Sequence, residues 1–337
     1  MTSDPRRATA TIEDVAAMAG VSRSTVSRVV NGATAVSPAA VAAVELAISE
    51  LNYVPNRAAR SLASRATMAI ALIVPEDTNR FFGDPFFASI VSGINARLSR
   101  SDYVLNLIIA SNDPRDKTAA YLRSGAVDGA IVVSHHTTDT FVDRIAAAVP
   151  VVYGGRPAHG RAGAYFVDID NVEGGRTATR HLVEAGRTRI GTISGPVDMP
   201  AGIDRLTGYR EVLQDAGLQV GPIEDGGFSS AGGYAAMERI LASGADIDAL
   251  FIASDLMARG ALAALERTGL RVPDDIAIVG FDDSPVATAV TPALTTVRQP
   301  SQLQGEQMVD VLLALLAGQE PSHATILSSE LIRRESA

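Results

Sequence analysis

Residues 11–31, TIEDVAAMAGVSRSTVSRVVN, constrain the fold more tightly than any other stretch of the chain. Thr11 and Asp14 have the spacing of a helix-capping box, and Gly20 permits a tight turn nine residues later. Apolar residues recur at helical spacing on both sides of this turn, which predicts two short helices that pack on each other. The stretch therefore predicts a helix-turn-helix, although a plain helical corner with a solvated polar face would show the same pattern.

The second helix of this motif leaves a polar face exposed. A helix-turn-helix places such a face in the major groove, where arginine reads guanine and hydroxyl groups bond bases or phosphates. We expect base contacts from Arg23, Ser24 and Arg28. The side chains expected to contact phosphates and set the register are Thr11, Ser22, Ser27, Asn31, Tyr53 and Asn56.

A third helix is predicted to begin at Ser37-Pro38, because Ser caps helices and Pro suits the first helical position. The whole run, from VSRSTVSRVVNG through VSPAAVAAVELAISELNYVPNRAARSLAS, resembles the head of the lactose-repressor (LacI/GalR) family of bacterial transcription regulators. The resemblance is long and specific. It implies that residues 1–55 form a DNA-binding head.

Residues 56–66 follow this head and have few large apolar side chains. A helix this short is marginal in water, because isolated helices below about 12 residues rarely hold. We expect the segment to fold only when it is paired and docked on DNA. The resemblance implies a hinge helix in which Leu62 enters the minor groove, with Ala63 beside it, whereas the residues alone equally suit an interdomain linker.

Charge is distributed unevenly along the 337 residues, whose net charge is −9. The first 66 residues contain seven arginines and five acidic residues, whereas the remainder contains 22 basic and 33 acidic residues. A mildly basic head on an acidic body suits a protein that touches DNA with its head alone. Cysteine is absent, no apolar run reaches the roughly 18 residues of a membrane span, and no signal peptide is evident. We expect a cytoplasmic protein without a membrane partner.

The body, residues 67–337, alternates short apolar runs with amphipathic helical patterns, as parallel doubly wound sheets do. The predicted strands are 69–74, 104–110, 129–133, 151–153, 165–167, 190–194, 250–253 and 276–279. The predicted helices are 85–99, 172–185, 205–216, 234–241 and 256–268. About 270 residues exceed one such core, so we expect two lobes.

The body also resembles the same family, more loosely, through RIGTISGP, DRLTGYREVL, GLRVPDDIAIVGFDD and PALTTVRQP. The resemblance implies a periplasmic-binding-protein-like α/β sensor whose lobes close over a small molecule. Lobe one is expected to contain about 67–167 and 297–323, and lobe two about 168–296 and 324–337. The resemblance further implies a homodimer that binds an approximately palindromic operator.

Ligands of such sheets bind beyond the carboxyl ends of the strands. The residues expected to bind the effector are Phe86, Arg156, Arg205, Ser254, Asp255 and Asp282. Asp282 follows a strand and can accept two sugar hydroxyls, Arg205 opens a helix and can donate a fork of hydrogen bonds, and Phe86 can stack on a sugar ring. In sugar regulators of the family, the residues that match Arg205 and Asp282 contact the effector.

Two departures from the family pattern bear on the effector. Ser254-Asp255 stands where many relatives have Asn-Asp, and Gly154-Gly155-Arg156 replaces an acidic residue found in some relatives. A carbohydrate-like effector is predicted, and a purine or nucleoside, or no effector at all, is the alternative. The chain is predicted to be a repressor, although some relatives bind DNA better with ligand than without.

Other classes of protein fit the sequence poorly. No G-x-G-x-x-G follows a predicted strand, as a nicotinamide-dependent enzyme would require. His135 and His136 are adjacent, so on a strand they would point to opposite faces and could not share a metal ion. The sequence contains no hydrolase or metalloprotease motif. We therefore expect no enzymatic activity, no metal and no cofactor.

Overall fold

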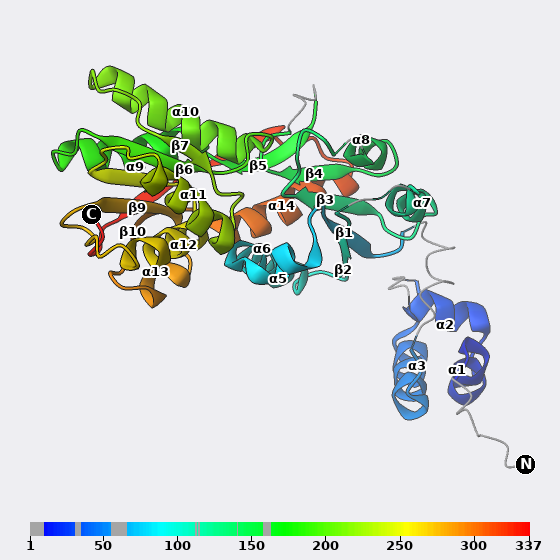
Figure 1. The fold of residues 1–337 in the computed structure, drawn as a ribbon. Coiled ribbons are helices and arrows are strands. Elements are labelled where there is room, and N and C mark those ends of the chain that lie inside the picture. The colour runs from blue at the N-terminus through cyan, green and yellow to red at the C-terminus, as the bar shows by residue number, and fades with distance from the viewer. Residues whose placement is uncertain are drawn as a thin grey trace, which may run out of the picture. The chain divides into compact units, whose positions relative to one another are not determined.

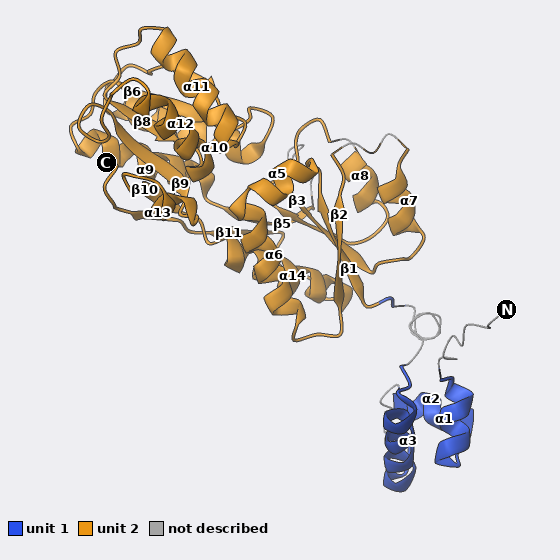
Figure 2. Ribbon diagram, turned by 60° about the horizontal axis from the view of Figure 1, so that its bottom comes forward, with its two compact units in different colours: residues 1–67 blue, residues 68–337 orange. Residues whose placement is uncertain are grey.

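The computed structural model describes residues 10–30, 35–54, 66–111, 113, 115–139, 141–157 and 163–337. The chain divides into two compact units, Met1–Thr67 and Met68–Ala337 (Figure 2). The predicted head, residues 1–55, belongs to the first unit, and the second unit is called the body below. Within the described residues, no helix is both long and apolar enough to cross a membrane.

The head contains the three predicted helices, α1 (Ile12–Ala19), α2 (Arg23–Val30) and α3 (Pro38–Leu51). The capping box is confirmed: the Asp14 amide donates to Thr11 Oγ1 over 3.3 Å, and the Thr11 amide donates to Asp14 Oδ2 over 2.8 Å. Gly20 ends α1 with a φ of 65°, which glycine adopts without strain.

One small apolar core holds the head together. Val15, Val26 and Val44 each come from a different helix, and all three are fully buried. A core this small leaves the outer face of α2 unpacked, so Ser22, Arg23, Ser24 and Arg28 are exposed. The packing therefore presents the polar face that the sequence predicts for DNA.

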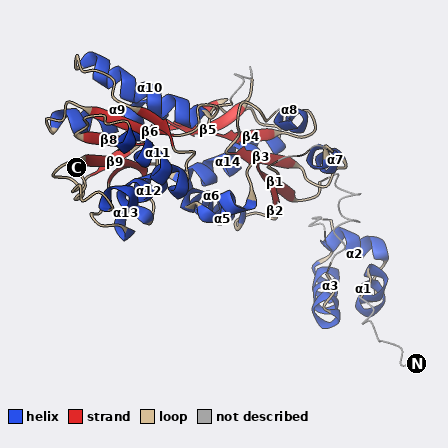
Figure 3. Ribbon diagram, in the orientation of Figure 1, coloured by secondary structure: helices blue, strands red, loops and turns tan. Residues whose placement is uncertain are grey.

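The body consists of two six-stranded sheets (Figure 3). The first has the order β11 (Ala324–Leu327), β5 (Tyr165–Ile169), β4 (Val151–Gly154), β3 (Gly129–Val133), β1 (Ala69–Val74), β2 (Val104–Ile109). The second has the order β12 (Glu330–Ile332), β10 (Thr295–Arg298), β9 (Ala277–Asp282), β8 (Ala249–Ile252), β6 (Ile190–Ser194), β7 (Ile223–Asp225). Every neighbouring pair is parallel except β10 with β12, so the predicted doubly wound parallel sheets are confirmed.

Helices cover both faces of each sheet (Figure 1). Those of the first lobe are α5 (Thr78–Gly83), α6 (Pro85–Leu98), α7 (Lys117–Arg123), α8 (Phe141–Ala146) and α14 (Ser301–Leu316). Those of the second lobe are α9 (Asn171–Glu184), α10 (Pro200–Asp215), α11 (Ser230–Ala242), α12 (Asp255–Glu266) and α13 (Val286–Ala289). In the first lobe, α6 and α14 cover one face of the sheet, around Ile90 and Leu312, and α7 and α8 cover the other, around Leu122 and Ile145.

The chain passes between the sheets three times, after Ile169, after Arg298 and after Leu327. The last passage corrects the expected lobe boundary, because residues 324–327 form β11 and pair with β5 in the first lobe. Of the expected segment 324–337, only the part beyond β11 reaches the second sheet. Such an edge strand has partners only on one side, and its alternating exposure leaves no continuous apolar run in the sequence.

Candidate functional site

A cavity lies between the two lobes at the carboxyl ends of their strands. Its empty space, counted together with its open mouth, is about 600 Å³. Its charged lining residues are Arg80, Asp84, Asp168, Arg205 and Asp282. The lining mixes these groups with apolar and aromatic surface, including Phe86, Met199 and Phe228.

Arg205 is the central cation of the cavity, and its side chain is only 5% exposed. Its guanidinium donates to Asn171 Oδ1 over 2.9 Å, to the Ala253 carbonyl over 2.7 Å and to Gln299 Oε1 over 3.3 Å. It also lies 3.6 Å from the centre of the Phe281 ring. These contacts lock the side chain in one orientation before any ligand binds.

Two glycines bring the helix that carries Arg205 close to its neighbour. A Cβ atom on Gly208 of α10 would lie 2.1 Å from the Val172 carbonyl of α9, and one on Gly175 would lie 2.3 Å from the Arg205 carbonyl. Only glycine permits this close approach. Arg205 lies inside α10, which begins at Pro200, rather than opening the helix as the sequence suggests.

Asp282 ends β9 and is the carboxylate nearest Arg205, with 3.6 Å between Oδ1 and Nη1. Gln299 Nε2 donates to the same oxygen over 2.7 Å. Burial raises the pKa of Asp282 well above its usual range, and the Arg205 guanidinium opposes that shift. Asp282 and Asp283 have φ values of 111° and 52°, a strained pair of the kind that accumulates at functional sites.

Asp255 holds this strained loop in place instead of lining the cavity. Its carboxylate accepts a hydrogen bond from the Thr296 hydroxyl over 2.7 Å and from the Ser284 amide over 2.8 Å. The carboxylate fits because residue 280 is glycine: a Cβ there would lie 2.4 Å from Asp255 Oδ1. Burial raises the pKa of Asp255 to about 7. The structure thus corrects the expected role, because Asp255 positions Asp282 from behind.

Asp168 adds an acceptor where the chain first passes between the lobes. Its carboxylate accepts from the Arg156 amide over 2.8 Å, from the Ile169 amide over 2.7 Å and from Asn171 Nδ2 over 3.0 Å. Burial raises its pKa. Because Asn171 also accepts from Arg205, this network connects the two carboxylates of the cavity floor.

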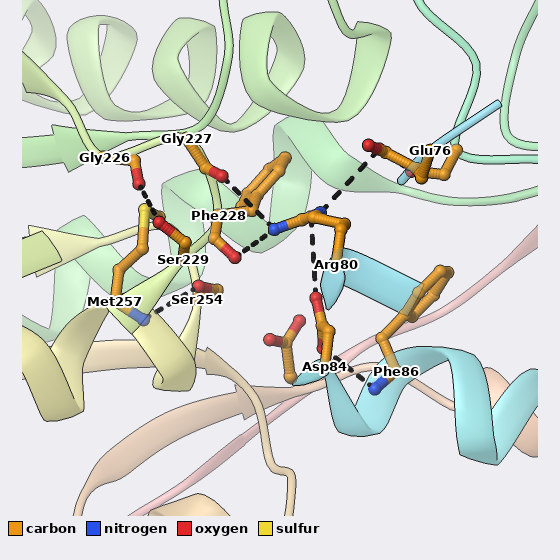
Figure 4. Close-up of polar contacts among 12 residues, drawn as sticks. Glu76, Arg80, Asp84, Phe86, Gly226, Gly227, Phe228, Ser229, Ser254 and Met257 are labelled. Atoms are coloured by element: carbon orange, nitrogen blue, oxygen red, sulfur yellow. Dashed lines mark hydrogen bonds and ion pairs between the residues drawn. The ribbon is translucent and has the colours of Figure 1, made fainter. Parts of the chain in front are cut away.

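The first lobe contributes Arg80, Asp84 and Phe86 to the cavity (Figure 4). Asp84 caps α6 by accepting from the Phe86 amide over 3.0 Å, which fixes the start of the helix that carries Phe86. Phenylalanine occurs at positions 81, 82, 86 and 87; of these, Phe81 and Phe87 are buried in the core and Phe82 is exposed. Phe86 is the one that lines the cavity.

Arg156 lies away from the cavity wall, in contrast to the expectation. Its guanidinium makes two hydrogen bonds to Asp204 of α10, over 2.8 and 2.9 Å, and the side chain is half exposed. This pair connects the lobes, because Arg156 follows β4 and Asp204 belongs to α10. Of the six residues expected to bind an effector, the structure brings Phe86, Arg205, Ser254 and Asp282 to the cavity.

Sequence reasoning missed Arg80, Asp84, Asn171, Gln299 and Gln304 as lining residues. Gln304 donates through Nε2 to the Val167 carbonyl, and its buried Oε1 has no hydrogen-bond partner within the described residues. The local signal for Asp84 was available, because Asp-Pro begins a helix there. Among the residues that the structure describes, no group of three or more His, Asp or Glu is placed to hold a metal ion.

The head presents its expected DNA contacts at the surface. Arg23 pairs with Glu13 over 3.2 Å while remaining 72% exposed, and Ser22 Oγ lies 2.8 Å from Ser24 Oγ. Arg28 and Thr11 are exposed, whereas Tyr53 is half-buried against the head core. Four further expected contacts lie outside the described residues: Asn31, Asn56, Leu62 and Ala63.

Comparisons with known proteins agree with both units. Residues 11–56 match the model of bacterial regulatory proteins of the lacI family, and residues 179–337 match a periplasmic binding protein-like domain. The HTH-type transcriptional regulator CelR of Thermobifida fusca is 45% identical over 98% of this chain and 99% of its own length.

The chain belongs to the LacI family. The solved structures agree with this assignment. A complex of the transcriptional regulator CelR with cellobiose has a TM-score of 0.77 at 42% identity, covering 97% of this chain and all of that one. A Lac repressor dimer bound to operator has a TM-score of 0.87 at 30% identity, covering 98% of this chain and 99% of that one. This LacI-family chain is therefore a DNA-binding transcription regulator with the predicted fold, and its relatives are regulators, not enzymes.

Proposed function

We propose that this regulator is a homodimeric repressor that acts in the cytoplasm and whose operator affinity is controlled by a disaccharide bound in the cavity. Cellobiose is the specific candidate, because it is the ligand in the complex of CelR, a regulator 42% identical to this chain in that structure. The protein acts by binding alone. The head, residues 1–55, contacts an approximately palindromic operator, and residues 56–66 connect it to the body.

The observation that carries the proposal is the preorganised group of Arg205, Asp282 and Asp168 at the cavity floor. Carboxylates accept pairs of sugar hydroxyls, and a guanidinium donates to hydroxyl and ring oxygens. Apolar surface from Phe86 and Phe228 matches the CH face of a sugar ring. Gln304 Oε1 supplies a further acceptor. A neutral, hydroxyl-rich ligand can satisfy all of these groups at once.

The test is calorimetric titration of the full chain with cellobiose, ribose and guanine, because the chain contains no tryptophan to report binding. We expect cellobiose to bind and to change the affinity for an operator selected from random palindromic DNA. Asp282→Ala should weaken cellobiose binding about 10- to 100-fold, since it removes a buried hydrogen-bonding group from the cavity floor.

Asp310→Asn serves as the matched control, because Asp310 pairs with Arg97 between α6 and α14 of the first lobe and lies outside the cavity lining. Its cellobiose affinity should equal that of the wild type. Binding of guanine or ribose instead of cellobiose would overturn the proposed effector, and unchanged cellobiose affinity in Asp282→Ala would overturn the proposed site.

A further inference from the structure

Besides Arg156, two side chains of the first lobe, Arg80 and His136, contact the second lobe, and both also contact the same carboxylate, Glu76. Glu76 lies in the segment between β1 and α5, and its side chain is 12% exposed. Arg80 lies in α5, and His136 lies in the loop after β3. We call Glu76, Arg80 and His136 the clamp.

The first arm of the clamp is Arg80 (Figure 4). Its Nη1 donates to the carbonyl of Gly227 over 3.2 Å and to the carbonyl of Phe228, both in the second lobe. Its Nε lies 3.7 Å from Glu76 Oε1, and its Nη2 lies 3.5 Å from Asp84 Oδ2. Two carboxylates of its own lobe therefore hold the guanidinium while it bonds the opposite lobe.

The segment that Arg80 contacts is conformationally strained. Phe228 has a φ of 48°, in the left-handed region that residues with a side chain rarely adopt, whereas Gly227, with a φ of 57°, adopts it freely. The Phe228 ring lies against Gly195, where a Cβ atom would come within 2.1 Å of it, and 5.5 Å from the Arg205 guanidinium. This turn therefore connects the first-lobe cation, Arg80, with the cavity cation of the second lobe, Arg205.

The second arm is His136, which bridges two carboxylates. Its Nδ1 lies 3.0 Å from Asp198 Oδ1 in the second lobe, and its Nε2 lies 3.3 Å from Glu76 Oε1. The Thr137 amide donates to the Asp198 carbonyl over 2.9 Å, which joins the backbones at the same place. Ser134 Oγ donates to Glu76 over 2.6 Å and orients the shared carboxylate.

Burial makes this arrangement energetically important. Arg80 and Glu76 are 15% and 12% exposed, so solvent screens them less than it screens the surface pairs of the body. Removing one partner of a buried pair leaves the other charge uncompensated, which costs far more than losing an exposed pair. Glu76 stands behind the cavity lining, whereas Arg80 and Ser134 form part of it.

We propose that Glu76 is a positioning residue that sets Arg80 and His136 as a two-armed clamp holding the lobes closed over the effector. Effector affinity then depends on a carboxylate that the effector does not touch, because closure and binding share one equilibrium. Because the clamp acts on closure, it also determines which ligands bind well. A ligand that keeps Arg80 away from the Gly227 and Phe228 carbonyls breaks one of the two contacts that hold the lobes together. This proposal takes its ligand from the proposed function, but the contact between the lobes can be tested without any ligand.

The experiment compares the full-length wild type with Glu76→Gln. The chain has no cysteine, so Ser124→Cys in the first lobe and Ser243→Cys in the second provide unique sites for spin labels. Both serines are exposed helix caps, one after α7 and one after α11. Labelled chain is diluted with unlabelled chain, and the distance between labels is measured by pulsed electron resonance with and without cellobiose.

Glu76→Gln should lengthen and broaden the distance distribution without ligand and raise the Kd for cellobiose about 10- to 100-fold. Glu211→Gln is the matched control, because it makes the same chemical change in a 2.7 Å pair with Arg176 inside the second lobe. It should leave both readouts at the wild-type values. Asp198→Asn breaks the second arm from the opposite lobe and should change both readouts in the same direction, but less.

An unchanged distance distribution in Glu76→Gln overturns the clamp, whatever sugar the protein binds. If thermal unfolding shows that Glu76→Gln does not fold, Asp198→Asn decides on the same readouts, since it alters only a partly exposed side chain. Failure of the wild type to bind cellobiose would count against the proposed effector, whereas the ligand-free distances would still support or overturn the clamp.

Discussion

In the head, the described side chains expected to contact bases, Arg23, Ser24 and Arg28, are exposed, whereas in the body the charged groups of the cavity are largely buried and share partners. Arg23 is 72% exposed and pairs on the surface with Glu13. Arg205 is 5% exposed and bonds Asn171, Gln299 and the Ala253 carbonyl while facing Asp282.

This difference determines what a substitution measures in each unit. An exposed side chain can be removed with little effect on folding, so its loss reports on recognition alone. A buried charge belongs to the fold as well as to the site, so its loss affects stability and binding together. The three predictions that follow test this contrast, from the largest expected effect to the smallest.

Arg205→Met should lower the free energy of unfolding of the body by about 3–5 kcal/mol, because Asp282 and Asp168 lose the cation that compensates them. It should also abolish the response to cellobiose. Urea unfolding followed by circular dichroism measures the first effect, and operator binding with and without sugar measures the second. If the free energy of unfolding were unchanged while the response to cellobiose disappeared, Arg205 would contribute to binding alone. The proposed difference between the head and the cavity would then be wrong.

Arg28→Ala should show the opposite profile. Loss of one good base contact should reduce discrimination between operator and random DNA by about 1–3 kcal/mol. Thermal unfolding should remain at the wild-type value, because Arg28 is exposed on α2 and outside the head core. Competition binding against random DNA is the measurement. An unaltered preference for operator would exclude Arg28 from base recognition.

The pH dependence of effector binding should report the protonation of His136, whose burial is intermediate between that of Arg205 and that of Arg28. The hydrogen bond to Glu76, together with Asp198, raises the pKa of His136 from 6.5 to about 9. The nearby Asp139, whose carboxylate accepts from the His136 amide, adds a third acidic group. The protonated ring favours the closed lobes, so its contribution is complete below pH 6.5 and is lost as pH rises through about 9.

Cellobiose affinity should therefore fall across this pH range in the wild type, and His136→Gln should remove the decline. We expect a difference of about 1 kcal/mol or less, since Asp198 is 39% exposed and solvent screens the pair. Calorimetric titrations at constant ionic strength measure it. An equal decline in the variant would assign the pH dependence to another group.

Sequence reasoning was most accurate where neighbours along the chain decide the structure. The capping box at Thr11, the strands 69–74, 129–133 and 190–194, and the parallel architecture all agree with the structure. The capping box and the strands depend on residues two to four positions apart, so they can be read locally, and the parallel architecture follows from the alternation of strands with helices. The carboxyl ends of strands also indicated where Ser254 and Asp282 would meet.

Contacts between distant segments were decided by the tertiary structure alone. Arg80 and Phe228 are 148 residues apart, and no local pattern indicates that they bond. Asp255 and Asp282 both lie at the carboxyl ends of strands. The space over Gly280 turns Asp255 toward Thr296, whereas the backbone at Asp282, with its positive φ, presents the carboxylate to Arg205. Likewise, β11 joins the first sheet because the edge of β5 offers it hydrogen bonds. The sequence by itself determined the elements and the polar groups at their ends; the packing of the two lobes decided which of those groups face the cavity and which hold it closed.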